Sequence, residues 1–179
     1  MIYAWTRRSA LVAIAVLAGC AARPAPTPPA AMTDAAWGAQ IKTKADPYTK
    51  VTTIQGGDIK AGQSAVHLRA AKSLERPDTP AKIVVYASLF YFGKTWAYFD
   101  RANTVDGRAW PVQSVRRDVF RCMSHNCSYG ELVLVDIDAA YLRSKQTEGI
   151  SLKIWGAGGE QVFAVPGPYI TAFLAEIGS

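Results

Sequence analysis

Hydrophobic and polar residues alternate along several short segments of the chain, a pattern typical of strands with one buried face. A β-branched run at residues 49–55 ends at two glycines, and residues 65–71 place valine, leucine and alanine on one side of a strand. The longest apolar run, KIVVYASLFYF at residues 82–92, is apolar on both sides. Gly93 and Lys94 follow it and suit a two-residue turn of type II′, which predicts an antiparallel hairpin between residues 82–92 and 95–99.

Two helices complete the pattern of elements. Asp138 is placed to cap a short helix over residues 139–145. From Pro168 to Ile177, apolar residues recur at i, i+3, i+4 and i+7, so one face of this helix should dock on a sheet. Further strands are expected at residues 112–120, 130–137, 150–154 and 161–165. The sequence therefore predicts a β-rich α+β fold, mainly an antiparallel sheet or sandwich, with the short helix and the C-terminal helix packed on it.

The N-terminus has the features of an export signal. Arg7 and Arg8 precede an apolar run, and Leu17-Ala18-Gly19-Cys20 closes it. The run is too short for a permanent transmembrane helix, which needs roughly 20 apolar residues. This motif resembles the lipobox of bacterial lipoproteins, and the resemblance implies cleavage before Cys20, acylation of Cys20 and membrane attachment. The alternatives are an ordinary secretory signal cut nearby, or an uncleaved anchor.

The resemblance and the composition together predict three regions. Residues 1–19 are interpreted as the signal peptide, residues 20–36 as the lipidated cysteine with a Pro/Ala-rich tether, and residues 37–179 as one β-rich domain. Ala21 stands where an aspartate would resemble an inner-membrane retention signal. We therefore expect attachment to the outer membrane, facing the periplasm.

Charge narrows the possible partners. The formal net charge of +6 falls to +4 when Arg7 and Arg8 are removed with the signal, and the remaining cations are scattered. Without a run of like charges, nucleic-acid binding is not expected. The mild positive charge is interpreted as an aid to solubility rather than as attraction to anionic headgroups.

Cys122 and Cys127 are the cysteines that remain after Cys20. In an oxidising compartment this pair predicts a disulfide that closes a hairpin loop with residues 123–126 at its tip. His125 lies between the two cysteines, but a structural zinc site needs four ligands and His67 is the only other histidine. No metal or other cofactor is therefore expected, and His67 is expected to face solvent.

Aromatic residues crowd the segment from Tyr86 to Phe99. Because strand side chains alternate, some of them must reach a second face, which we expect to be covered as part of a two-sided core. The alternative is a surface for a sugar or a partner protein, for which the candidate binding residues are Tyr91, Trp96, Tyr98 and His125. The chain also resembles uncharacterised envelope lipoproteins that combine a W-x-Y-F strand with a C-x4-C hairpin, here Trp96, Tyr98, Phe99 and the cysteine pair. No particular activity follows from this resemblance.

No catalytic constellation is found in the sequence, and the leading hypothesis is therefore not an enzyme. It is a lipid-anchored envelope protein that binds or scaffolds another envelope protein or peptidoglycan. One alternative is a hydrolase or metal-handling protein that uses His125, which would need a concave pocket there. Another is a carrier of a small apolar ligand held between helix and sheet. An exposed aromatic patch would favour the leading hypothesis.

Overall fold

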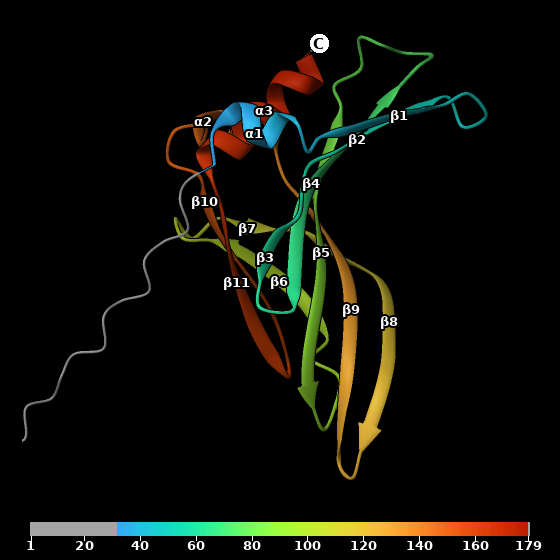
Figure 1. Ribbon diagram of the computed structural model, residues 1–179, viewed down its shortest axis with the longest axis vertical. Coiled ribbons are helices and arrows are strands. Elements are labelled where there is room, and N and C mark those ends of the chain that lie inside the picture. The colour runs from blue at the N-terminus through green and yellow to red at the C-terminus, as the bar shows by residue number, and fades with distance from the viewer. Residues whose placement is uncertain (1–31, 179) are drawn as a thin grey trace, which may run out of the picture. The chain divides into compact units, whose positions relative to one another are not determined.

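The computed structural model describes residues 32–178 (Figure 1). Within them it shows two antiparallel sheets and three short helices, which confirms the β-rich α+β class. The predicted signal peptide, Cys20 and most of the predicted tether lie outside the described residues.

In chain order the elements are α1 (Asp34–Gly38), β1 (Lys42–Asp46), β2 (Val51–Gln55), β3 (Ile59–Ala61), β4 (Ser64–Ser73), β5 (Lys82–Gly93), β6 (Phe99–Thr104), β7 (Ala109–Trp110), β8 (Val112–Met123), β9 (Asn126–Asp136), α2 (Ala139–Ser144), β10 (Ile150–Gly156), β11 (Gly159–Val165) and α3 (Gly167–Gly178).

The larger sheet has the strand order β1-β2-β4-β5-β9-β8, and β3 pairs with the other end of β4. The smaller sheet has the order β11-β10-β6-β7. The three helices gather at one end of the domain, whereas β5, β8 and β9 run together toward the other end, where the turn of the β8–β9 hairpin lies (Figure 1).

The hydrophobic core lies on one face of the larger sheet. Alternate residues of its central strands point inward, including Leu68, Val85 and Val133. They form one cluster with residues of the smaller sheet, such as Leu152, and with Phe173 of α3. These five side chains are at most 1% exposed. The predicted docking of the apolar face of the C-terminal helix is therefore confirmed.

The hairpin predicted at Gly93-Lys94 is wrong. β5 pairs with β9 as far as Gly93, and residues 95–99 do not pair with it. The chain instead crosses to the smaller sheet, where β6 pairs with β10. A local turn signal could not show that the strand paired with this end of β5 begins at Asn126, far along the chain.

The expected cover on both faces of β5 is also absent among the described residues. The smaller sheet and α3 pack on the inner face, and the outward residues Phe92 and Phe120 remain 69% and 61% exposed. We call this outward side of β4, β5, β8 and β9 the open face.

Two local predictions are confirmed. Asp138 caps α2 by accepting a hydrogen bond of 2.7 Å from the backbone nitrogen of Ala140. Cys122 and Cys127 lie opposite each other across the β8–β9 hairpin and are joined by a disulfide.

Candidate functional site

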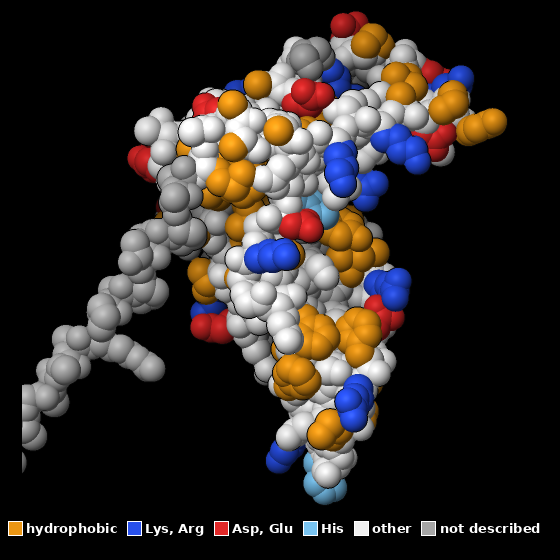
Figure 2. Space-filling model, in the orientation of Figure 1, with side chains coloured by type: hydrophobic (Ala, Val, Ile, Leu, Met, Phe, Trp, Pro, Cys, Tyr) orange, Lys and Arg blue, Asp and Glu red, His pale blue; other side chains and the backbone are white. Residues whose placement is uncertain are grey.

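The open face carries an apolar stripe that follows β5 and β9. Strand alternation produces it, because every second residue of these strands points away from the core. Figure 2 shows hydrophobic side chains along this side of the domain, over β5, β8 and β9. The stripe consists of Val84, Tyr86, Phe90, Leu132 and Leu134, and continues into Phe92 and Phe120.

Three phenylalanines make the aromatic part of the stripe. The ring of Phe90 lies 5.4 Å from that of Phe92 and 5.6 Å from that of Phe120, measured between centroids. Gly130 makes room for this arrangement, because a Cβ at Gly130 would lie 2.6 Å from a ring carbon of Phe120. The register of the β8–β9 pair shifts between Val119 and Arg121, and Phe120 sits in this irregularity. Such bulges redirect side chains, so simple alternation did not reveal Phe120.

A hollow of about 500 Å³ lies at the helical end of the stripe. Its floor includes Val84, Tyr86 and Leu134, and Arg69 and Lys82 line it as cations. The volume of this hollow is in the range of small-ligand pockets, and its lining mixes apolar with polar and charged side chains. The Lys82 amine lies 3.2 Å from the carboxylate of Asp136, which also lines the hollow.

His67 lies beside this hollow and is not solvated as expected. It is 9% exposed, its ring stacks on Tyr86 at 4.8 Å, and its Nδ1 lies 3.0 Å from Asp58 Oδ1. Burial lowers the pKa of His67, and the hydrogen bond that its ring donates to the Asp58 carboxylate opposes this effect. No Ser, Thr or Cys side chain bonds to His67 within residues 32–178, so the described residues supply it with no nucleophile. Its observed role is to support one face of the Tyr86 ring.

A buried carboxylate fixes the inner side of the same strands. Glu131 is 1% exposed and accepts hydrogen bonds from the Tyr91 hydroxyl at 2.6 Å and from Arg117 Nε at 3.1 Å. The backbone nitrogens of Tyr98 and Phe99 donate to it at 2.9 and 3.3 Å. Tyr98 has a φ of 52°, in the left-handed region, where the chain crosses between sheets. With four donors around it, Glu131 is a structural anchor for this crossing.

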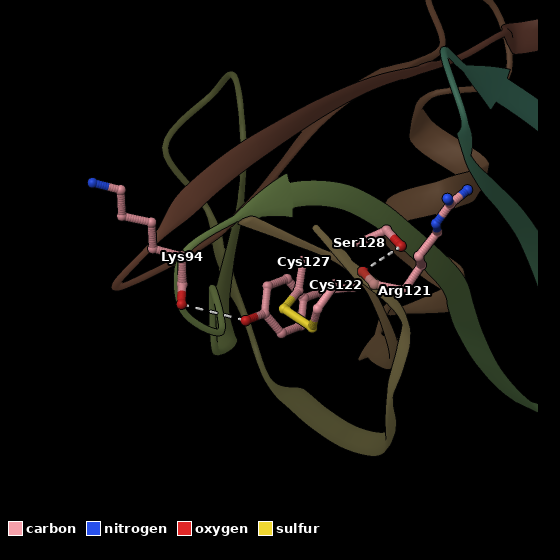
Figure 3. The surroundings of a disulfide bond; sticks show 6 residues. Lys94, Arg121, Cys122, Cys127 and Ser128 are labelled. Carbon is pink, nitrogen blue, oxygen red and sulfur yellow. Dashed lines mark hydrogen bonds between the residues drawn. A yellow bond between two sulfur atoms is a disulfide. The ribbon is translucent and has the colours of Figure 1, made fainter. Parts of the chain in front are cut away.

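The far end of the open face is the β8–β9 hairpin with its disulfide (Figure 3). Next to the disulfide, Ser128 Oγ donates a hydrogen bond of 3.2 Å to the carbonyl of Arg121. The hydroxyl of Tyr129 donates to the carbonyl of Lys94 at 3.4 Å, which ties the chain after β5 to the hairpin. His125 is exposed in the turn of the hairpin.

The structure separates the four candidate binding residues. Tyr91 is committed to Glu131, and Trp96 packs on Tyr129 with a centroid distance of 4.6 Å. Tyr98 is 48% exposed and lies under the Arg117 guanidinium at 5.0 Å. These three surround the chain crossing, whereas His125 lies at the hairpin turn. The aromatic residues of the open face are instead Tyr86, Phe90, Phe92 and Phe120. Phe120 lies outside the aromatic segment that the sequence singled out.

Residues 32–178 contain no group of three or more His, Cys, Asp or Glu side chains placed to hold a metal ion. None of their helices has the length and apolar character to cross a membrane.

No family model, no curated protein and no solved structure matches the chain.

Proposed function

We propose that this is a lipid-anchored cell-envelope protein with a non-enzymatic binding or scaffolding role. Its anchor is the acylated Cys20, its location is the outer membrane facing the periplasm, and its partner is another envelope protein that docks on the open face. The observation that carries the proposal is the uncovered aromatic stripe. Large contiguous apolar patches on the surface of a soluble protein usually mark interaction sites.

The form of the stripe favours a protein partner over peptidoglycan. Glycan chains need many hydrogen-bonding groups, whereas the stripe offers mainly hydrocarbon and aromatic rings. One face of the Tyr86 ring is already covered by His67. The hollow at Val84 and Leu134 can instead receive an apolar side chain, as at the centre of protein interfaces.

The geometry gives little support to the alternative functions. A hydrolase or metal-handling protein would need His125 inside a pocket with a nucleophile or further ligands. His125 is exposed, and no bond from it to another side chain is found among the described residues. A carrier that holds its ligand between α3 and the sheet would need space where Ile170 and Phe173 are fully buried.

Site-specific photo-crosslinking in cells tests the proposed partner surface. Ser88 is exposed on β5, on the open face between Tyr86 and Phe90, and is replaced by p-benzoylphenylalanine. Val162, a 54% exposed strand residue of the smaller sheet, is the matched control position. We expect a discrete protein adduct from position 88 and none from position 162, with the adduct lost when Phe90→Asp is added.

Three results would count against the proposal. The first is the absence of an adduct from position 88, and the second is an equal adduct from position 162. The third is retention of the purified protein on isolated peptidoglycan that depends on Phe90, which would change the class of partner.

A further inference from the structure

The geometry points to a second contact surface, at the end of the β8–β9 hairpin, that inserts into the surface of an anionic lipid bilayer. We call this surface the distal tip and define it by Phe92, Phe120 and Met123 with the cations Lys94 and Arg121. It shares Phe92 and Phe120 with the end of the stripe, but it goes beyond the proposed partner docking, because it assigns a lipid contact to side chains of the folded domain itself.

The distal tip leaves an unusual amount of apolar surface in water. Phe92, Phe120 and Met123 are 69%, 61% and 64% exposed. Phe92 and Met123 also line a hollow of about 340 Å³ together with Arg121. Figure 2 shows hydrophobic side chains and cations near the narrow end of the domain, with a histidine at the very end. Burying such side chains in a bilayer interface removes apolar area from water, which favours insertion.

The charge of the distal tip has one sign. Residues 82–99 and 119–130 contain no aspartate or glutamate. Lys94 and Arg121 are exposed, and neither side chain forms an ion pair within residues 32–178. Two other cations of the open face do have partners: Arg116 lies 2.6 Å from Asp118, and Lys82 lies 3.2 Å from Asp136. Aromatic and apolar side chains flanked by unpaired cations match a surface of anionic headgroups. Lys94 and Arg121 extend to opposite sides of the hairpin (Figure 3), so each can meet a headgroup while the apolar side chains enter the interface.

The backbone of the distal tip is suited to a shallow apolar environment. Polar backbone groups that enter a bilayer must be hydrogen-bonded within the protein. β9 is paired on both sides as far as Cys127, which lies opposite Gly93 and Cys122. β8 is the edge strand of the sheet, so its outer backbone groups still need water and the tip enters only the interfacial region of the bilayer. Met123 pairs with Asn126 across the turn, and the disulfide clasps the hairpin immediately before it. The tip is therefore ordered before it meets a membrane, and insertion costs little further ordering.

A bilayer fits this surface better than a protein partner does. A protein interface is usually centred on a pocket that the partner fills, as on the stripe near Val84. At the distal tip the hollow is smaller, about 340 Å³ against about 500 Å³ near Val84, and the apolar side chains beside it project into solvent from the end of a hairpin. A deformable apolar phase with anionic headgroups can surround such an end without a matching shape.

The test places a tryptophan at the distal tip of the full chain. Phe92→Trp keeps an aromatic side chain there, and Tyr48→Trp is the control at a position that is 95% exposed in the β1–β2 turn. Each chain is mixed with vesicles whose acyl chains carry bromine, made either of phosphatidylcholine or of phosphatidylcholine with phosphatidylglycerol. Quenching of the added tryptophan, relative to the unsubstituted chain, reports its contact with acyl chains. Because the signal arises at the tip, membrane attachment through the N-terminus does not mimic it.

We expect quenching of Phe92→Trp in the anionic vesicles, little in phosphatidylcholine alone, and little for Tyr48→Trp in either. Adding Lys94→Gln and Arg121→Gln should lower the apparent affinity of the tip for the vesicles about 30-fold. Lys60→Gln, an exposed cation on β3, should leave it unchanged. Unchanged unfolding midpoints and an intact disulfide show that the variants fold.

The inference is overturned if Phe92→Trp is not quenched, or is quenched equally in both kinds of vesicle. It is also overturned if Tyr48→Trp gives the stronger signal, which would move the membrane contact to the β1–β2 turn. A photo-crosslinker at Met123 that captures a protein in cells, without vesicle quenching, would assign the tip to a protein instead. None of these results affects crosslinking from position 88, so the two proposals fail independently.

Discussion

The hydroxyl of Tyr91 donates a hydrogen bond of 2.6 Å to the buried carboxylate of Glu131 and accepts one of 2.7 Å from the backbone nitrogen of Ala97. This relay joins the two sheets, because Tyr91 and Glu131 belong to the larger sheet and Ala97 leads into β6 of the smaller one. Burial, together with the bond to Glu131, raises the pKa of Tyr91 well above that of a free phenol. Tyr91 therefore remains a proton donor at physiological pH.

Glu131→Gln should lower the free energy of unfolding by about 3 kcal/mol, since a buried charged acceptor is replaced by a neutral group with two donors of its own. Urea unfolding at pH 7 measures this loss. Glu160→Gln, which removes the exposed partner of Lys153, should cost less than about 0.5 kcal/mol. If the double variant with Tyr91→Phe loses the full sum of both single losses, the two residues do not act as one network.

Tyr169→Phe should reduce stability at pH 7 by about 2 kcal/mol, because the Tyr169 hydroxyl accepts a 2.8 Å hydrogen bond from the buried backbone nitrogen of Leu68. Burial also raises the pKa of Tyr169 above its ordinary value of 10.0. Since the unfolded chain releases this proton first, the contribution is complete below pH 10 and declines as the pH rises further.

The difference in unfolding free energy between the native chain and Tyr169→Phe should therefore shrink above pH 10. The slope of this change approaches about 1.4 kcal/mol per pH unit for one proton. Urea titrations at pH 8, 10 and 11 measure it. A difference that stays constant over this range would show that the phenol of Tyr169 is not protected in the folded state.

Local sequence patterns predicted those elements whose partners are close in the chain. The spacing of Ile170, Phe173 and Ile177 predicted a docked helix, Asp138 predicted a cap, and the Cys122–Cys127 pair predicted a clasped hairpin. Each of these signals depends on residues that lie only a few positions apart in the sequence. Their success follows from the local origin of helix periodicity, capping and short loops.

Features that depend on distant pairing were not predictable in this way. The run at residues 82–92 is apolar on both sides, and nothing in it shows that only one side is covered. Glu131 did carry a signal that was missed, because it shares the strand phase of the buried Val133 and Val135. An acidic residue in phase with core positions indicates a buried carboxylate with dedicated donors.

His67 should titrate below the ordinary histidine value of 6.5, because burial beside Tyr86 lowers its pKa. A lowered pKa in the folded state means that its contribution to stability is complete above pH 6.5 and declines as the pH falls. Ring-proton shifts in NMR spectra give the pKa directly. Asp58→Asn should lower it further, since the Asp58 carboxylate favours the charged ring and Arg69 nearby already disfavours it. A rise in the pKa of His67 in that variant would contradict the assigned causes.

Replacing both Cys122 and Cys127 by serine should lower the free energy of unfolding by about 2 kcal/mol, because the disulfide restricts a short loop in the unfolded chain. The bond lies at the hairpin end, away from Leu152, Ile170 and the rest of the core, so the variant should keep its fold. Urea unfolding of the unsubstituted chain and of the double variant measures the loss.

Mass spectrometry of the unsubstituted chain under denaturing conditions should show the bond as a deficit of two hydrogens relative to the reduced chain. Free thiols at both cysteines, or a metal retained under native conditions, would contradict this pairing and make the Cys122–Cys127 loop a candidate site for redox or metal chemistry.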